Sequence, residues 1–207
     1  MGRSKEKGGG EERRGEEQRK KMLLVVDNLS SFMPDLVRAL DTLDTKYVVK
    51  RYTELASTDG IAGEYDGIIL SGRKRNERSM NVINMNIVGE ACREDRPLLG
   101  ICYGAEVMAL AMHGTIRRVG RITGEEEVYV HEDNPIAGSG VMLVYESHDY
   151  SIATLPSVLK SVAYSRSCSN EIVMHASKPI FGTQFHPEAS YDHGLELLRR
   201  FVMLTNR

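Results

Sequence analysis

The first half of the chain alternates between apolar runs and segments of helical spacing, and this alternation constrains the fold most. The apolar runs occupy residues 22–26, 47–49, 65–70 and 97–101. Segments with apolar residues at helical spacing follow them at 32–43, 81–94 and 105–112. Apolar runs without polar alternation are typical of strands that are buried on both faces of a parallel sheet. The sequence therefore predicts an α/β fold with a mainly parallel sheet.

The second half of the chain predicts a different kind of sheet. Shorter segments with strand character are found at 117–122, 127–130 and 141–145, and a further strand is expected at 180–185. We expect the short strands to form a partly antiparallel section. An amphipathic segment at 191–204 predicts a closing helix. Together the two halves indicate three layers, with helices on both faces of one central sheet.

Length and composition favour one globular domain. The chain has 207 residues, of which 41% are hydrophobic and 27% charged, and its net charge is −2. There is no basic field to attract nucleic acid, and no apolar run reaches membrane-spanning length. Residues 1–21 mix both charges with glycines, so we expect a disordered tail there, rather than a secretory signal, and one domain over 22–207.

The three cysteines indicate a reducing environment. Cys92, Cys102 and Cys168 match neither a zinc-binding spacing nor a disulfide framework. We therefore expect free thiols and a cytoplasmic protein. Cys92 and Cys168 are interpreted as packing residues.

Cys102 stands out because of its neighbours. The segment Gly100-Ile-Cys-Tyr-Gly104 lies between an expected strand and an expected helix. This is the arrangement of a nucleophile elbow, in which a sharp turn presents a reactive side chain at the top of a sheet. The glycines would let neighbouring backbone pack closely, and the helix N-terminus would lower the pKa of the thiol. The amide of Tyr103 is then placed to donate to an oxyanion.

A base for that nucleophile is available in Gln184-Phe-His-Pro-Glu188. In an extended segment the side chains of His186 and Glu188 would point the same way. A carboxylate that orients an imidazole is what a cysteine nucleophile requires. Taken alone, the segment is an ordinary loop histidine beside a surface glutamate, but the cysteine elbow favours the catalytic interpretation.

These motifs resemble those of the class I (triad) glutamine amidotransferases. That family carries an S-G-G-P loop, then G-x-C-x-G, then H-P-E, and here the same order runs through Ser71-Gly72, 100–104 and 186–188. The resemblance spans roughly residues 22 to 205 and implies a flavodoxin-like fold. Segments 146–148 and 183–188 look most like the stand-alone amidotransferase subunit of archaeal GMP synthase.

The resemblance implies a role for each matching position. Cys102 would attack the carboxamide of glutamine and form a thioester, His186 would act as general base and acid, and Glu188 would orient His186. The backbone amides of Gly72 and Tyr103 would form the oxyanion hole. The glutamine pocket would include Gly104, Glu106, Ser147 and His148, and residues 145–150 would lie near a partner.

The resemblance also implies a partner that uses ATP. The sequence holds no Walker-type phosphate loop, and His113, His131, His175 and His193 show no metal-ligand spacing. We therefore expect no cofactor and no metal site in this chain. ATP and Mg²⁺ would bind a partner synthetase subunit, and the ATP-pyrophosphatase subunit of GMP synthase is the partner expected first.

Two positions depart from the family pattern. Arg73 replaces the second glycine of S-G-G-P, and a positive φ there would be costly for arginine. Glu106 replaces a glutamine that commonly lines the glutamine pocket, and its charge would repel a substrate carboxylate and could raise the pKa of Cys102. If Arg73 and Glu106 pair, the two changes compensate each other.

Three functions stay open from the sequence. The first is an active glutaminase subunit that supplies ammonia to a synthetase. The second is a divergent hydrolase for another γ-glutamyl compound or amide, with a pocket altered by Arg73 and Glu106. The third is a non-catalytic regulatory subunit that kept the three catalytic residue types by descent.

Overall fold

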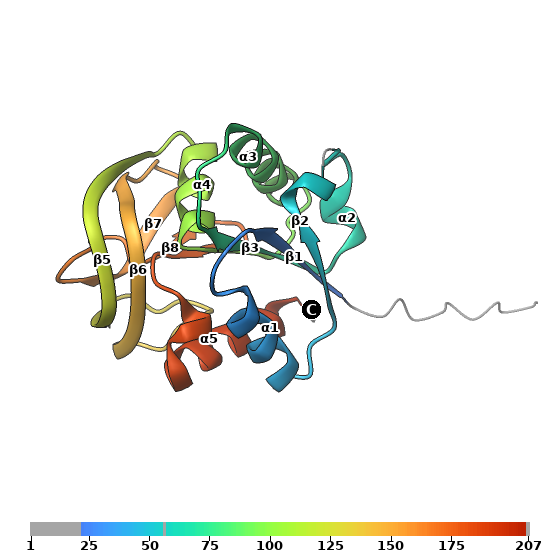
Figure 1. The fold of residues 1–207 in the computed structure, drawn as a ribbon. Helices are drawn as coiled ribbons and strands as arrows, with labels where there is room; N and C mark the ends of the chain where they lie inside the picture. The colour runs from blue at the N-terminus through green and yellow to red at the C-terminus, as the bar shows by residue number, and fades with distance from the viewer. Residues whose placement is uncertain (1–21, 56, 206–207) are drawn as a thin grey trace, which may run out of the picture.

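The computed structural model describes residues 22–55 and 57–205, and within them one nine-stranded sheet carries helices on both faces (Figure 1). The strand order is β2-β1-β3-β4-β9-β8-β7-β5-β6. The segment 1–21 lies outside the described residues, so the disorder predicted there, and the single domain over 22–207, stay predictions.

Five strands form the parallel part of the sheet. They are β1 (Leu23–Asn28), β2 (Tyr47–Arg51), β3 (Gly67–Arg73), β4 (Leu98–Ile101) and β9 (Ile180–Thr183). All four pairings between them are parallel, in the order β2-β1-β3-β4-β9. This is the strand order of flavodoxin-like sheets, in which ligands bind beyond the carboxyl ends of the strands near the point where the order reverses.

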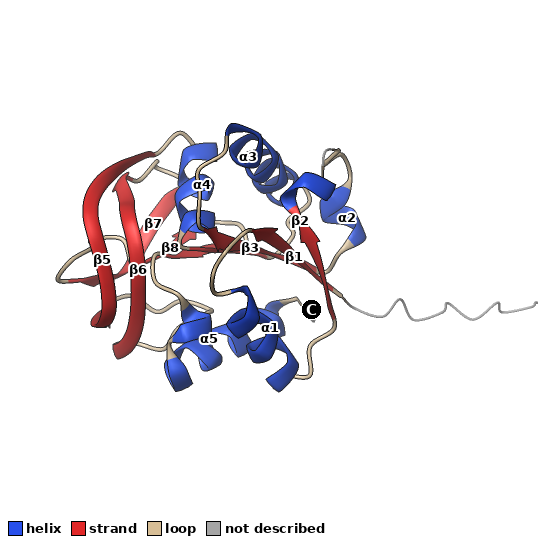
Figure 2. Cartoon of the chain, viewed as in Figure 1, coloured by secondary structure: helices blue, strands red, loops and turns tan. Residues whose placement is uncertain are grey.

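Helices cover both faces of the parallel part (Figure 2). One face carries α1 (Met33–Thr42) and α5 (Tyr191–Leu204), and the other carries α3 (Arg78–Arg93) and α4 (Tyr103–Ala111). Short helical segments are η1 (Tyr52–Glu54), α2 (Ile61–Glu64) and η2 (Pro187–Ala189). Within the described part of the chain, no helix is long and apolar enough to cross a membrane.

The apolar runs explain why the parallel part of the sheet is buried on both faces. Along β1, Leu24 and Val26 belong to the core under α3 and α4, whereas Leu23 and Val25 belong to the core over α1 and α5. Successive side chains of a strand point to opposite faces, so a run without polar residues fills both cores. The prediction of a mainly parallel three-layer fold is confirmed by this topology.

The antiparallel part differs in detail from the prediction. It consists of β5 (Thr115–Val130), β6 (Gly140–Thr154), β7 (Leu159–Ser165) and β8 (Ile172–His175). The short strands expected at 117–122 and 127–130 are parts of β5, and β7 and β8 were not predicted. Most of β5 is exposed or half-buried, with polar residues throughout its middle. The apolar pattern is therefore too weak there to show the full length of the strand.

Strand β6 is the last strand of the sheet, and part of its free edge is covered by the segment that follows β9. The amide of His186 donates to the carbonyl of Tyr145 at 2.9 Å, and the amide of Tyr145 donates to Oγ of Ser190 at 2.9 Å. Further along, the amide of Leu143 donates to Nδ1 of His193 at 3.1 Å. These bonds attach the His186 segment to β6.

Candidate active site

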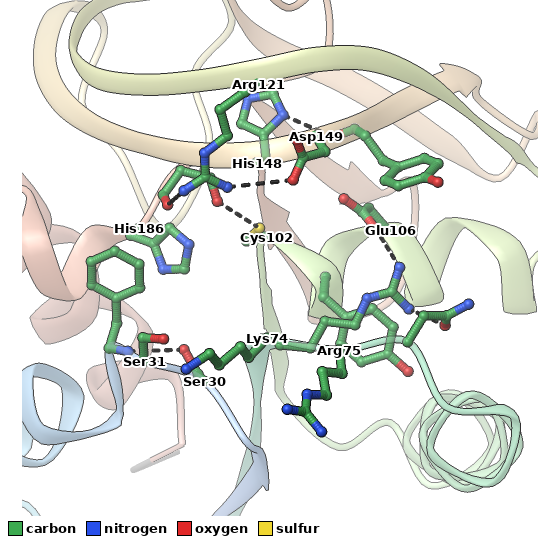
Figure 3. A pocket seen from close by; sticks show the side chains of 16 residues that line it. Ser30, Ser31, Lys74, Arg75, Cys102, Glu106, Arg121, His148, Asp149 and His186 are labelled. Carbon is green, nitrogen blue, oxygen red and sulfur yellow. Dashed lines mark hydrogen bonds and ion pairs between the residues drawn. The ribbon is translucent and has the colours of Figure 1, made fainter.

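A cavity of about 350 Å³ lies at the carboxyl ends of β1, β3 and β4 (Figure 3). Ser30 and Phe32 follow β1, Arg73 ends β3, and Cys102 follows β4. The opposite wall comes from residues 147–150 of β6, and His186 closes one side. This is the location that the strand order predicts for a ligand site.

Cys102 is the turn residue of a nucleophile elbow. It lies directly between β4 and α4 with φ 52° and ψ −104°, a backbone conformation that costs of order 1–3 kcal/mol for a non-glycine residue. A Cβ atom at Gly100 would lie 2.4 Å from the backbone of Gly104, and one at Gly104 would lie 2.3 Å from the carbonyl oxygen of Leu70. Both glycines are therefore required by close backbone packing, as predicted.

Cys102 and His186 meet in the cavity, although they lie far apart in the chain. Strands β4 and β9 are parallel neighbours, so their carboxyl ends reach the same edge of the sheet. The thiol and the imidazole both line the cavity, where the imidazole acts to lower the pKa of the thiol. The thiol donates to the carbonyl of Ser147 at 3.9 Å. Figure 3 shows the sulfur at the centre of the cavity, between His186 and Glu106.

Glu188 holds the imidazole of His186 from behind. Its Oε1 lies 2.8 Å from Nδ1 of His186, and both side chains are almost fully buried. The predicted contact is present, but its geometry is not the extended one that was expected. Residues Pro187–Ala189 form the 3-10 helix η2, which turns the carboxylate back toward the ring. Phe32 lies against the same ring at a centroid distance of 4.1 Å.

Burial and charge shift the pKa values of this pair together. Burial lowers the pKa of His186, but Glu188 and Cys102 more than offset it and raise the value to about 10. Burial raises the pKa of the Cys102 thiol, and His186 opposes that rise. The helix N-terminus was expected to lower the pKa of this thiol, and that prediction is wrong, because the pKa is raised by burial. The predicted contribution of Glu106 is confirmed, as its charge adds to the rise.

The two predicted oxyanion donors border the reactive pair. Tyr103 is the first residue of α4, and the first amides of a helix have no partner within it. Gly72 lies in β3 against His186, where a Cβ atom would be 2.9 Å from Cε1 of the ring. The strand β3 continues to Arg73 in extended conformation, and Arg73 is not among the described residues with positive φ. The strain considered for Arg73 is therefore absent.

Arg73 and Glu106 form an ion pair on the wall of the cavity. Nη2 of Arg73 lies 3.7 Å from Oε2 of Glu106, and their side chains are 14% and 5% exposed. The predicted pairing is confirmed by this contact. Burial raises the pKa of Glu106, and the guanidinium of Arg73 opposes that rise. Arg73 also lies over the ring of Tyr103, 4.2 Å from its centroid.

The other residues predicted for the glutamine pocket differ in their surroundings. Gly104 packs against Leu70 and is not among the residues that line the cavity. Ser147 lines the cavity and accepts a hydrogen bond from Arg121 at 3.0 Å. His148 also lines it. Substrate binding by these residues stays a prediction.

Behind the cavity, His148 belongs to a buried polar cluster. Its Nδ1 donates to the carbonyl of Tyr150 at 2.8 Å, and its Nε2 lies 3.1 Å from Oε2 of Glu146. Burial raises the pKa of Glu146 to about 7, and burial together with the neighbouring Glu146 raises that of Glu171. Ser165 donates to Glu171 at 2.6 Å. This cluster joins β6, β7 and the start of β8.

Sequence reasoning missed several residues of the cavity. Phe32 was assigned only to a helix, although it follows a strand whose carboxyl end marks the site. Arg121, Asp149 and Tyr150 lie on the long β5–β6 hairpin, where Arg121 contacts Asp149 at 3.4 Å. The strand order could have indicated Phe32. Asp149 and Tyr150 were expected only near a partner, and no sequence signal identified Arg121. Among the residues that the structure describes, no group of three His, Cys, Asp or Glu side chains could hold a metal ion.

The fold and the cysteine elbow define the class of protein. The chain belongs to the class-I glutamine amidotransferases, because the model of the family described as glutamine amidotransferase class-I matches residues 24–204.

Among individual relatives, the chain is similar to the glutamine-hydrolysing subunit of GMP synthase from Methanosarcina acetivorans. The two are 36% identical over 191 residues, which cover 88% of this chain and 96% of that protein. The corresponding protein of Methanocaldococcus jannaschii is 31% identical, over 86% and 94% of the two chains. A crystal structure from Thermoplasma acidophilum, described as that of a candidate GMP synthase subunit, superposes with a TM-score of 0.81 at 26% identity, over 90% and 94% of the two chains.

Proposed function

We propose that this chain is the glutamine-hydrolysing subunit of a GMP synthase, with Cys102, His186 and Glu188 as its catalytic residues. The single observation that carries the proposal is the meeting of a strained elbow cysteine with a buried imidazole that a carboxylate holds at 2.8 Å. The similarity to archaeal subunits named for glutamine hydrolysis supports the choice of substrate and of synthetase.

The first half of the reaction forms a thioester. The sulfur of Cys102, whose proton is held on Nε2 of His186, bonds to the side-chain amide carbon of glutamine, and Nδ1–H of His186 donates to Glu188. The negative charge develops on the amide oxygen, where the amides of Tyr103 and Gly72 would stabilise it. The C–N bond then breaks, the imidazolium gives its proton to the leaving nitrogen, and ammonia departs.

The second half releases glutamate. A water molecule gives a proton to the neutral imidazole and adds to the thioester carbon. The C–S bond breaks, and His186 keeps its proton beside the sulfur of Cys102, as at the start. The net change is glutamine plus water to glutamate plus ammonia. Phe32, against the imidazole, would limit its rotation between the two steps.

The ammonia would serve a second subunit that uses ATP. We propose the ATP-pyrophosphatase subunit of GMP synthase as this partner, with ATP and Mg²⁺ bound there. Residues 147–150 of β6 line the cavity, and Tyr145 lines a second cavity that shares Phe32 with it. We propose that the segment 145–150 faces the partner subunit.

Ammonia release from glutamine tests the proposal. We expect release by the purified chain together with an archaeal ATP-pyrophosphatase subunit, and at least a thousandfold loss in Cys102→Ala, since the nucleophile is then absent. Cys168→Ala is the matched control, because Cys168 is buried away from the cavity. Undiminished release by Cys102→Ala would refute the assignment.

One observation favours a second candidate function. The Arg73–Glu106 pair lines the cavity where the family pattern has an uncharged residue at each position. A divergent hydrolase for another γ-glutamyl compound would keep Cys102 as nucleophile. It would turn over γ-glutamyl peptides or amines faster than glutamine, and a panel of such substrates separates the two functions.

A further inference from the structure

The end of β3 departs from regular pairing with β1 just before the cavity. Val26 of β1 pairs with Leu70 of β3. Two residues further along β1, Asn28 pairs with Arg73, which lies three residues further along β3. The extra residue falls within Ser71-Gly72. An extra residue in one strand leaves backbone groups without ladder partners, and such irregularities are common next to active sites.

Two buried side chains satisfy the backbone groups at this irregularity. Nδ2 of Asn28 donates to the carbonyl of Ser71 at 3.1 Å, and the backbone amide of Asn28 donates to Oγ of Ser71 at 2.9 Å. The same hydroxyl donates to the carbonyl of Gly72 at 2.9 Å. The peptide before Gly72 and the peptide after it are therefore both held by side chains.

Asn84 of α3 fixes the orientation of Asn28 from the opposite side. Nδ2 of Asn28 donates to Oδ1 of Asn84 at 3.1 Å, and Nδ2 of Asn84 donates to Oδ1 of Asn28 at 2.7 Å. Asn84 also donates to the carbonyl of Met80 at 2.9 Å. Both N–H bonds of each amide are thereby used. Neither buried side chain can turn without leaving polar groups unpaired, which is costly.

The network acts on a peptide whose other end borders the reactive pair. The carbonyl of Ser71 and the amide of Gly72 belong to one planar peptide unit, in which the C=O and N–H bonds point in opposite directions. By holding the carbonyl, Asn28 also sets the direction of the Gly72 amide. A Cβ atom at Gly72 would lie 2.9 Å from Cε1 of His186, so this residue lies against the catalytic ring.

We propose that Asn28, Ser71 and Asn84 are positioning residues, which hold the Gly72 peptide so that its amide donates to the oxyanion. This inference rests on the proposed function, in which the Gly72 amide is an oxyanion donor. Such a donor stabilises charge that exists only in the transition state. Loss of the network should therefore lower kcat and leave KM nearly unchanged. A network that only stabilised the fold would lower the free energy of unfolding and leave kcat unchanged.

Two substitutions that preserve shape test the proposal. Asn28→Asp replaces both side-chain donors with an acceptor, so the carbonyl of Ser71 loses its partner. Ser71→Ala removes one hydroxyl and is mild enough to serve if Asn28→Asp fails to fold. In the complex with an archaeal ATP-pyrophosphatase subunit, we expect kcat for ammonia release to fall by about thirtyfold in Asn28→Asp and about tenfold in Ser71→Ala, because removal of a whole oxyanion donor costs about a hundred- to a thousandfold. KM for glutamine should stay within about twofold of that of the parent chain.

Two reagents separate the direction of the amide from general damage at Cys102. Acylation by p-nitrophenyl acetate passes through an oxyanion before p-nitrophenolate leaves, whereas alkylation by iodoacetamide displaces iodide and forms no oxyanion. We expect each variant to slow acylation of Cys102 by about the same factor as kcat and to keep its alkylation rate within about twofold. Cys102→Ala supplies the background rate for both reagents.

Asn170→Asp is the matched control. Nδ2 of Asn170 donates to the carbonyl of Ile152 at 3.0 Å, so this variant also deletes a buried bond from a side-chain amide to a backbone carbonyl, but in the antiparallel part of the sheet. It should lower the urea midpoint and leave kcat and both rates at Cys102 within about twofold of the parent values. Circular dichroism verifies the folding of every variant.

The proposal would be overturned by an unchanged kcat in Ser71→Ala, by acylation and alkylation that slow equally, or by an equal loss of kcat in Asn170→Asp. A parent chain in which neither glutamine nor p-nitrophenyl acetate acylates Cys102 would overturn it as well. Failure of the proposed function is a separate result. A parent chain that reacts with p-nitrophenyl acetate through Cys102 but releases no ammonia from glutamine would lose the glutaminase assignment, and the acylation rates of the variants would still decide the roles of Asn28 and Ser71.

Discussion

Replacing Gly104 by alanine tests whether the packing of α4 against β3 holds the nucleophile in place. A Cβ atom at this position would lie 2.3 Å from the carbonyl oxygen of Leu70, whereas ordinary contacts begin at 3.4 Å. The start of α4 must therefore move away from β3 by about 1 Å, and it carries Cys102 and the amide of Tyr103 with it. The obstacle is backbone of a central strand, which cannot yield.

Both stability and rate follow from this displacement. Overpacking typically lowers the free energy of unfolding by about 1–3 kcal/mol. The better helix propensity of alanine offsets up to about 1 kcal/mol of that loss. We expect the free energy of unfolding to fall by about 1–2 kcal/mol. A displacement of about 1 Å at a catalytic group can cost about a hundredfold in rate, so ammonia release should fall by about that factor.

The assays are urea denaturation and ammonia release at saturating glutamine. Gly89→Ala in α3 is the matched control, because its new Cβ would approach no atom closer than 3.7 Å. The free energy of unfolding of that variant should rise by up to about 1 kcal/mol, and its rate of ammonia release should be unchanged. If Gly104→Ala retained both the stability and the activity of the parent chain, the packing argument would be refuted.

Three further predictions concern charge and strain. Glu188→Gln removes a charge that raises the pKa of His186. The imidazolium that lowers the pKa of the Cys102 thiol is then less stable, so the pH midpoint for alkylation of Cys102 by iodoacetamide should move upward. An unmoved midpoint would contradict the contact between Glu188 and His186. The free energy of unfolding of Cys102→Gly should be about 1 kcal/mol higher than that of Cys102→Ala, because glycine tolerates φ 52°. Equal urea midpoints of the two variants would argue against backbone strain at this position. Because burial raises the pKa of Glu146 from 4.5 to about 7, the folded chain holds a proton that the unfolded chain releases, and stability should fall as pH rises through this window. Glu146→Gln should flatten that decline in urea denaturation at several pH values, and an unchanged slope would count against a protonated Glu146.

The sequence predicted the parallel part of the fold because its signals are local. Apolar runs such as 22–26 fill both cores without help from other segments, and the glycines around Cys102 mark a strand-to-helix turn. The approach of His186 to Cys102 was predicted from the family resemblance, and the parallel pairing of β4 with β9 explains it, because neighbouring parallel strands end at one edge of the sheet.

The remaining features depend on contacts that no local pattern encodes. The length of β5 is set by pairing with β6, so its polar middle was divided into short strands. The upward shift in the pKa of Cys102 follows mainly from tertiary burial, which the sequence did not reveal, and the predicted contribution of Glu106 is smaller. The turn at η2 that brings Glu188 to His186 is likewise unlike the extended segment that its sequence suggested.

The covered edge of β6 has a consequence for solubility. An unpaired edge strand is a template on which another chain can add, and proteins protect such edges by covering them. Here the same segment that carries His186 occupies the backbone groups of that edge at Leu143 and Tyr145. Detachment of this segment would inactivate the chain and at the same time expose an unpaired edge strand to other chains. Loss of activity and onset of self-association during storage or heating would then share one structural origin.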